Sequence, residues 1–118
     1  MNRQFKGKTA EFLARMYMRL LGFSIVAQNY VTGRGTTAGE IDFIAKRGKM
    51  LVFVEVKERR TLRDAAYSIT PLQRQRILRG ARSFVRHNQQ FTHYDMRFDA
   101  ILVALPFRIQ HIPNAWTA

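Results

Sequence analysis

The chain has no cysteine among its 118 residues, which excludes disulfide bonds and thiolate metal sites and is compatible with a reducing cytoplasm. It also has no run that approaches the roughly 18 apolar residues of a membrane span, so we expect no membrane segment. Acidic residues are few: 8 Asp and Glu stand against 20 Lys and Arg, a formal net charge of +12. This favours nucleic acid as the partner, although a solubilising charge or an anionic membrane surface would give the same total.

Several motifs of well-known enzyme classes are absent too. There is no Gly-x-x-x-x-Gly-Lys or Gly-x-Gly-x-x-Gly segment, which argues against an NTPase or a dinucleotide enzyme. The histidines, His87, His93 and His111, have no metal-ligand spacing, and we assign them no catalysis. The length suits one domain, residues 1–118.

The hydrophobic pattern predicts a mixed α/β domain in the order α-β-β-β-α-β-β, a central sheet flanked by helices. Helices are expected over residues 3–21, ended by Gly22, and over residues 70–88, opened by Thr70 and Pro71. Residues 32–37 should form a loop, and residues 59–68 should be irregular. The expected strands are residues 24–30, 39–45, 50–57, 96–104 and 107–112.

Each predicted helix has a stripe that should pack on the sheet. In the second helix it is Ile77, Ala81, Phe84 and Val85, opposite a face with Arg74, Arg76, Arg79, Arg82 and Arg86. In the first helix the apolar stripe is Thr9, Leu13, Met16, Tyr17 and Leu20. Another stripe of that helix contains Gly7, Glu11, Ala14 and Met18, and its small residues would let Glu11 approach the sheet. The alternative is a surface pair of Glu11 with Arg15, which the spacing alone favours.

Glu55 and Lys57 interrupt a strongly apolar predicted strand. Residues two apart in a strand point the same way, so these two side chains share one face while Val52, Val54 and Val56 occupy the other. Charges in an apolar sheet cost several kcal/mol per ion unless a partner or a metal compensates them. This pair is therefore the first candidate for chemistry.

The strand before it adds two acidic residues. If the hairpin turns about Arg47 and Gly48, Glu40 faces Glu55 and Asp42 lies diagonal to Glu55. Carboxylates at that range repel one another unless a cation is shared, and Mg²⁺ favours such oxygen ligands. Lys57 could orient or deprotonate a water and stabilise charge on a phosphate. The alternative is a structural salt-bridge cluster of the acids with lysine and arginine.

Motifs spread over almost the whole chain resemble one family. They are Gly7-Lys-x-Ala10-Glu11, Asn29, Gly39-Glu-Ile-Asp42, Val54-Glu55-Val56-Lys57-x-Arg59, Arg97-Phe-Asp99 and His111-Ile112-x-x-Ala115. Together they look like the YraN-like family of small bacterial proteins. That family is similar to the PD-(D/E)xK nuclease superfamily, especially archaeal Holliday junction resolvases.

The resemblance implies a restriction-endonuclease-like α/β fold and a metal-dependent nuclease in the bacterial cytoplasm. It gives catalytic roles to Asp42, Glu55 and Lys57. It implies Mg²⁺ or Mn²⁺ held by Asp42, Glu55 and the Val56 carbonyl, with Glu11 joining through water. Glu40 is an accessory candidate from the hairpin register.

Partners follow from the same resemblance and from the basic residues. DNA is favoured over RNA, in branched or repair-intermediate form, and a homodimer is an option because resolvase-like enzymes commonly act as symmetric pairs. Gln73 stands where the family tends to carry a lysine, and its amide can still contact a phosphate. The residues expected to hold nucleic acid are Lys8, Arg34, Arg59, Arg60, Gln73 and Arg74.

Two other functions remain open at this point. One is a nucleic-acid-binding adaptor that has the same fold and does not hydrolyse its ligand. The other is a structural or assembly protein whose basic faces meet an acidic protein.

Overall fold

The structure is a computed structural model that describes residues 3–33, 38–104, 106 and 108–116, with side chains from Lys8 onward. The expected element order is confirmed, and one short helix is added to it. Its elements are α1 (Arg3–Leu20), β1 (Ser24–Thr32), β2 (Gly39–Arg47), β3 (Met50–Glu58), α2 (Leu62–Tyr67), α3 (Pro71–His87), the 3₁₀ turn η2 (Gln89–Phe91), β4 (Asp95–Ala104) and β5 (Arg108–Trp116). In the part of the chain that is described, no helix is long and apolar enough to cross a membrane.

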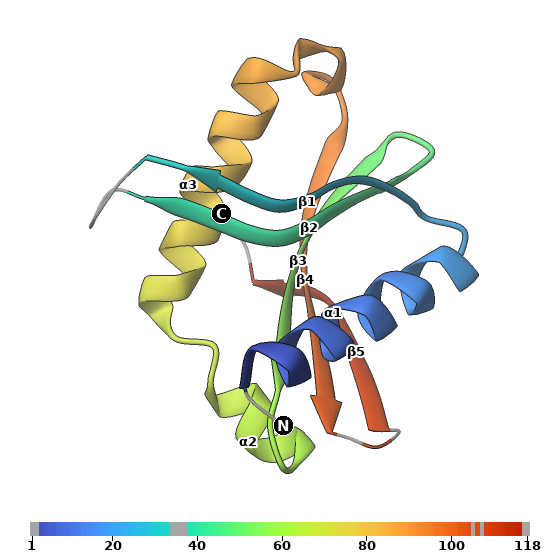
Figure 1. The fold of residues 1–118 in the computed structure, drawn as a ribbon. Coiled ribbons are helices and arrows are strands. Elements are labelled where there is room, and N and C mark those ends of the chain that lie inside the picture. The colour runs from blue at the N-terminus through green and yellow to red at the C-terminus, as the bar shows by residue number, and fades with distance from the viewer. Residues whose placement is uncertain (1–2, 34–37, 105, 107, 117–118) are drawn as a thin grey trace.

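The five strands form one mixed sheet in the order β1-β2-β3-β4-β5. Strands β3 and β4 are parallel, and the other neighbours are antiparallel. A parallel pair needs a long crossover connection, which α2 and α3 supply. Helix α1 packs on one face of the sheet, whereas α2 and α3 pack on the other (Figure 1).

The prediction that residues 59–68 are irregular is wrong, because α2 forms there. Its first turn is closed by Thr61, whose Oγ1 accepts a hydrogen bond from the Asp64 N–H at 3.0 Å. A threonine followed three residues later by an acid is a known start signal for a helix. Ala65 then anchors this short helix among buried residues of β4.

Helix α1 ends as the glycine predicted. Gly22 has a φ of +91°, and the N–H groups of Gly22 and Phe23 donate to the carbonyls of Arg19 and Met18, each at 3.0 Å. This is the Schellman arrangement, in which glycine takes the left-handed position without a steric cost. The turn brings Phe23 back onto the core beside Met18.

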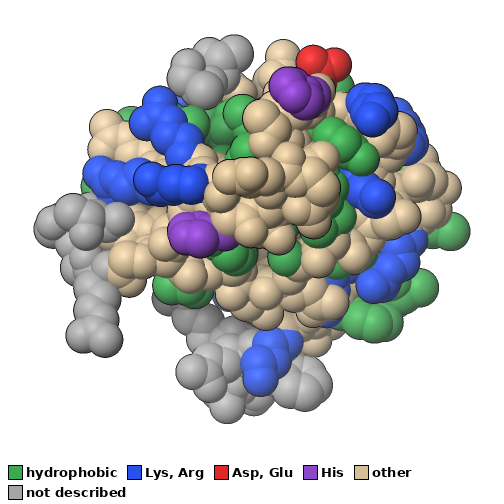
Figure 2. Space-filling view, turned by 90° about the horizontal axis from the view of Figure 1, so that it is seen from above, with side chains coloured by type: hydrophobic (Ala, Val, Ile, Leu, Met, Phe, Trp, Pro, Cys, Tyr) green, Lys and Arg blue, Asp and Glu red, His purple; other side chains and the backbone are tan. Residues whose placement is uncertain are grey.

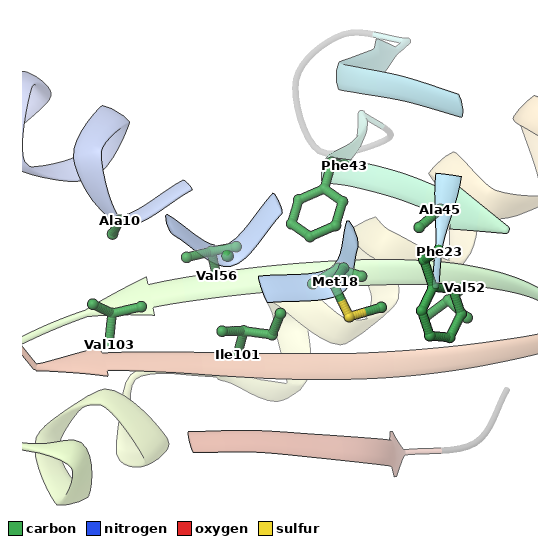
Figure 3. Packing of buried hydrophobic residues seen from close by; sticks show 11 residues of the cluster. Ala10, Met18, Phe23, Phe43, Ala45, Val52, Val56, Ile101 and Val103 are labelled. Carbon is green, nitrogen blue, oxygen red and sulfur yellow. The ribbon is translucent and has the colours of Figure 1, made fainter. Parts of the chain in front are cut away.

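The buried face of α1 is not the predicted apolar stripe. Ala10, Ala14 and Met18 face the sheet, whereas Met16 and Leu20 are 44% and 84% exposed. The small side chains let the helix lie close to the valines of β3, and Met18 fills the space beside Phe23 (Figure 3). Residue size, more than hydrophobicity, therefore selects the packed face here.

The β2–β3 hairpin is real, but its register differs from the expected one. Arg47 pairs with Met50, so the loop consists of Gly48 and Lys49, and Ile44 faces Phe53. The expected pairs of Glu40 with Glu55 and Asp42 with Phe53 are wrong. Gly48 has a φ of +59°. Two-residue hairpin turns require a positive φ at their first residue, so glycine at this position favours the tight turn. The shift is two residues along the partner strand, so the side chains of the paired residues 43–47 and 50–54 keep their predicted faces.

Helix α3 touches β2 through two glycines. A Cβ atom added to Gly39 would lie 2.5 Å from the backbone nitrogen of Gly80, and one added to Gly80 would lie 3.0 Å from the Ile41 side chain. Only glycine allows the first of these contacts. The pair brings α3 close to the start of β2, where Glu40 and Asp42 lie.

We therefore expect Gly39→Ala to destabilise the protein by about 1 to 3 kcal/mol, because backbone must move to admit the methyl group. Gly80→Ala should cost less, since a side chain can yield and alanine gains about 1 kcal/mol of helix propensity over glycine. Urea denaturation of the two variants measures the difference. Equal stability of Gly39→Ala and the wild type would show that the contact does not constrain the packing.

Candidate active site at the ends of β2 and β3

One pocket brings together half of the candidate site residues. It lies where the start of β2 and the end of β3 meet the first half of α3. The strands contribute Glu40, Asp42, Glu55, Val56 and Lys57, and the helix contributes Gln73, Arg76 and Ile77. The sequence-predicted acids and lysine are therefore brought together by the fold.

Asp42 lies where the pairing of β2 with β3 ends. The last paired residues are Phe43 and Val54, and beyond them the Asp42 Oδ2 accepts a hydrogen bond from the Val56 N–H at 2.7 Å. Ile41 and Ile44 both pack toward α3, so the alternation of side chains breaks around Asp42. The carboxylate thus takes the place of a backbone partner and is held against β3.

Glu55 and Lys57 occupy the same face of β3, as the strand period predicts. Val52, Val54 and Val56 fill the opposite face against α1. Glu55 is only 8% exposed, and its Oε1 lies 3.2 Å from the Lys57 Nζ. The pair is an ion pair at the edge of the core, with both side chains directed to the pocket that α3 covers.

The electrostatics of the acids reflect their crowding. Burial, and next the charge of Glu55, raise the pKa of Asp42 to about 8, against the opposing hydrogen bond from Val56. Burial also raises the pKa of Glu55, although the Lys57 ammonium opposes that rise. The carboxyl groups of Asp42 and Glu55 also act on each other's pKa. Two carboxylates in this situation favour a proton or a cation between them.

Gln73 connects α3 to the lysine. With its amide oxygen toward β3, it accepts a hydrogen bond from the Lys57 Nζ at 2.7 Å while its nitrogen donates to the Ser68 carbonyl at 2.9 Å. In the opposite orientation the oxygen accepts from the Thr70 N–H at 3.3 Å. The first arrangement satisfies two groups at shorter distances, and we adopt it. Lys57 is then held between Glu55 and Gln73.

Glu11 and Glu40 border this site without joining the Asp42–Glu55 pair directly. Burial raises the pKa of Glu11, Arg15 opposes the rise, and the charge of Glu40 adds to it. Glu11 also acts on Asp42 electrostatically. Glu11 itself lines a neighbouring pocket with Lys8, Arg15, Gln28 and Asn29. The small-residue stripe of α1 therefore does bring Glu11 toward the sheet, and its interaction with Arg15 is present as well.

The donors available for a metal ion are oxygens. Among the described residues, no group of three or more His, Cys, Asp or Glu side chains is placed to hold a metal ion. The site offers two carboxylates, Asp42 and Glu55, beside the Val56 backbone. Mg²⁺ usually keeps several waters and takes one or two protein carboxylates, so this donor set and its excess negative charge suit a hard divalent cation.

The predicted nucleic-acid contacts are scattered around the site. Lys8, Arg60 and Arg74 are exposed, and Arg59 donates to the Glu58 carbonyl at 2.6 Å just beyond Lys57. Arg34 lies outside the described residues. Arg76 differs from the prediction: it lines the site pocket and does not lie on the outer face of α3. Its neighbours Gln73 and Ile77 show why, since they share one side of the helix.

A second charged cluster lies away from this pocket. Asp99 is fully buried and accepts hydrogen bonds from Arg97 at 2.8 Å to each oxygen, from the His111 Nε2 at 2.7 Å and from the Asn114 N–H at 2.9 Å. Burial would raise the pKa of Asp99, but these hydrogen bonds outweigh burial and lower it. The cluster joins β5 to β4. Arg97, Asp99 and His111, which belong to two of the family motifs, therefore have a structural role.

The surface elsewhere is predominantly basic. The end of the molecule that carries the β2–β3 turn shows Lys and Arg side chains on several sides and acidic side chains at a single place (Figure 2). Of the 8 acidic residues in the chain, Glu40, Asp42 and Glu55 meet in the site pocket, and Glu11 lies near enough to act on Asp42. Three of the 8 acidic residues thus share one pocket of a chain with a net charge of +12.

Fold and site together define a small mixed α/β protein with a buried and a half-buried carboxylate beside a lysine. The chain belongs to a family described as "Uncharacterised protein family UPF0102", whose model matches residues 10–103, and this confirms the YraN-like resemblance. A UPF0102 protein of Paramagnetospirillum magneticum is 48% identical over 114 residues, 96% of this chain and 88% of that protein. UPF0102 proteins of Rhodopseudomonas palustris strain HaA2 and Bradyrhizobium diazoefficiens are 41% and 38% identical, each over 95% of this chain and over 84% and 81% of their own lengths.

Proposed function

We propose that the protein is a metal-dependent nuclease that hydrolyses phosphodiester bonds in DNA, with branched or repair-intermediate DNA as its substrate. The observation that carries this proposal is the meeting of Asp42, Glu55 and Lys57 in one pocket of a chain with a net charge of +12. The choice of DNA and of branched structures rests on the resemblance to resolvases in the PD-(D/E)xK superfamily.

Asp42 and Glu55, with the Val56 carbonyl, would hold Mg²⁺ or Mn²⁺ in this proposal. When bound, the cation supplies Lewis-acid activation of water and neutralises charge on the phosphate. The pairing of two acids whose pKa values are both raised supports this role, because a cation would relieve their repulsion. Glu11 and Glu40 add negative charge nearby and would act through water.

Lys57 is the residue that would act on the reacting groups. Its ammonium is oriented by Glu55 at 3.2 Å and Gln73 at 2.7 Å, which leaves a donor for the attacking water or a phosphate oxygen. In hydrolysis the water oxygen forms a bond to phosphorus, the bridging P–O bond breaks, and the leaving oxygen takes up a proton. A cation fixed in advance stabilises the charge that develops on the phosphate oxygens.

The surrounding basic residues would bind the DNA backbone. Lys8, Arg59, Arg60 and Arg74 lie on elements that border the site, and phosphate contacts of this kind provide affinity that falls steeply with salt and carries little sequence information. The protein would therefore recognise the structure of the DNA and not its base sequence.

One observation favours a second candidate function. The Lys57 ammonium is already neutralised by Glu55, as a structural salt bridge would require. A protein with this fold that binds nucleic acid without cutting it would retain the same pair. Such an adaptor would show salt-sensitive binding with no cleavage and no dependence on metal.

A cleavage assay distinguishes the two candidate functions. Purified protein is incubated with branched, duplex and single-stranded DNA in Mg²⁺ or Mn²⁺, and with the chelator EDTA. We expect metal-dependent cleavage that falls about 10²-fold in Lys57→Ala, because a preorganised cation is lost. Lys49→Ala removes the same charge from the β2–β3 loop, at the opposite end of β3 from Lys57, and should cleave as the wild type does. Binding without cleavage under every metal condition would establish the adaptor instead.

A further inference from the structure

A buried nitrogen of Arg76 has no hydrogen-bond partner. The side chain extends from α3 and lines the site pocket with Glu40, Asp42 and Glu55. Its Nε is enclosed, and no acceptor for it exists among the residues that the structure describes. A guanidinium stays charged at every accessible pH, so the missing acceptor cannot be avoided by loss of a proton.

The nearby acids do not satisfy Arg76. Glu55 forms its ion pair with Lys57, and Asp99 forms ion pairs with Arg97 and His111. A buried donor without an acceptor destabilises a folded protein. An arginine in this situation at the mouth of an acidic pocket therefore indicates that its acceptor arrives with a ligand.

Helix geometry fixes the side of α3 from which Arg76 extends. Gln73, Ile77 and Gly80 share the inner side of α3 with Arg76: Gln73 contacts Lys57, Ile77 is buried, and Gly80 rests against Gly39. These contacts hold the helix against the start of β2. Arg76 is thus positioned across the pocket from the β3 side chains Glu55 and Lys57.

We propose that Arg76 binds the phosphate that is cut, with its guanidinium on the non-bridging oxygens. This inference rests on the proposed nuclease function and adds a residue to it. The planar guanidinium matches the spacing of phosphate oxygens and donates in parallel to two of them. Lys57 from β3 and Arg76 from α3 then hold the phosphate from two sides, against the repulsion of Asp42 and Glu55.

The proposal separates Arg76 from the arginines that contact the rest of the DNA backbone. Exposed residues such as Arg60 and Arg74 would contribute affinity and leave the rate of the bound complex unchanged. A group on the scissile phosphate stabilises charge that develops during reaction, so its removal lowers kcat more than it weakens binding.

The test compares Arg76→Gln and Arg76→Lys with Arg82→Gln, an equal loss of charge at an exposed position of the same helix. With branched DNA and Mn²⁺, Arg76→Gln should lower kcat about 10²-fold, and Arg76→Lys should recover part of the loss. The Kd for the same DNA in EDTA should change no more than in Arg82→Gln. Thermal unfolding should show no loss of Tm in Arg76→Gln, because its buried nitrogen makes no hydrogen bond in the described structure.

Two results would overturn the inference. The first is that Arg76→Gln cleaves as fast as Arg82→Gln. The second is that Arg76→Gln loses both activity and Tm and that Arg76→Lys recovers both, because this would show that the residue has a structural role. If the wild type cleaves no DNA, the proposed function fails, and binding of inorganic phosphate followed by ³¹P NMR decides about Arg76. A phosphate signal broadened by the wild type and Arg82→Gln but not by Arg76→Gln supports the site, and equal broadening by all three contradicts it.

Discussion

Asp42→Asn is expected to lower metal-dependent DNA cleavage by roughly 10³-fold or more and, in EDTA, to raise the free energy of unfolding by about 1 kcal/mol. Both effects have one cause. Burial and the charge of Glu55 raise the pKa of Asp42 to about 8, so its negative charge is unfavourable in the fold without a cation. Asparagine removes the charge and can still accept the Val56 hydrogen bond, which is 2.7 Å long in the wild type.

Such opposite changes in activity and stability are typical of a site in which function opposes folding. The measurements are cleavage rates in Mn²⁺ and urea denaturation in EDTA. Asp95→Asn is the matched control, because Asp95 is an exposed aspartate at the start of β4 and should change neither quantity. A destabilised Asp42→Asn would mean that the carboxylate is a structural partner of β3, as in the salt-bridge alternative.

Asp99→Asn is expected to lower the stability of the protein strongly, for a reason unrelated to the candidate active site. The substitution should cost about 3 to 5 kcal/mol, because it leaves the buried partners of a charged cluster uncompensated. Asp99 is fully buried, and it holds Arg97 and His111 through hydrogen bonds of 2.7 to 2.8 Å. Urea denaturation near neutral pH measures the loss.

The loss should depend on pH in a defined direction. The folded pKa of Asp99 lies below its ordinary value of 3.8, so the cluster contributes stability above that value and loses it as the pH falls through the folded pKa. The stability difference between the wild type and Asp99→Asn should therefore shrink as the pH falls below about 5. Asp95→Asn should stay within about 0.5 kcal/mol of the wild type, as surface substitutions usually do. A difference that is constant down to acid pH would contradict the role assigned to the carboxylate.

Much of the fold follows from the sequence because hydrophobic period and turn residues act locally. Gly22 predicted the end of α1, and Thr70 with Pro71 predicted the start of α3. The strand period placed Glu55 and Lys57 on one face of β3. These features depend on a few neighbouring residues, so no tertiary information was needed.

The errors arise where distant parts of the chain meet. The register of the β2–β3 hairpin depends on which two residues form its turn, and an offset of one turn position changes every pair by two residues. The apolar stripe predicted for α1 is not the packed one, because the small residues of the neighbouring stripe fit close to the valines of β3, which hydrophobicity alone does not indicate. Arg76 was grouped with the other arginines on the outer face of α3, although its place beside Ile77 was a sign that it faces inward.

The central claim is that Asp42 and Glu55 hold a divalent cation in the pocket that Lys57 shares. The most direct test is a crystal of the protein soaked in Mn²⁺, with anomalous scattering used to locate the ion. We expect an anomalous peak within ligand distance of both carboxylates, and this peak should be lost in Asp42→Asn. A crystal with no peak there, in which the Lys57 ammonium instead bridges the two carboxylates, would contradict it.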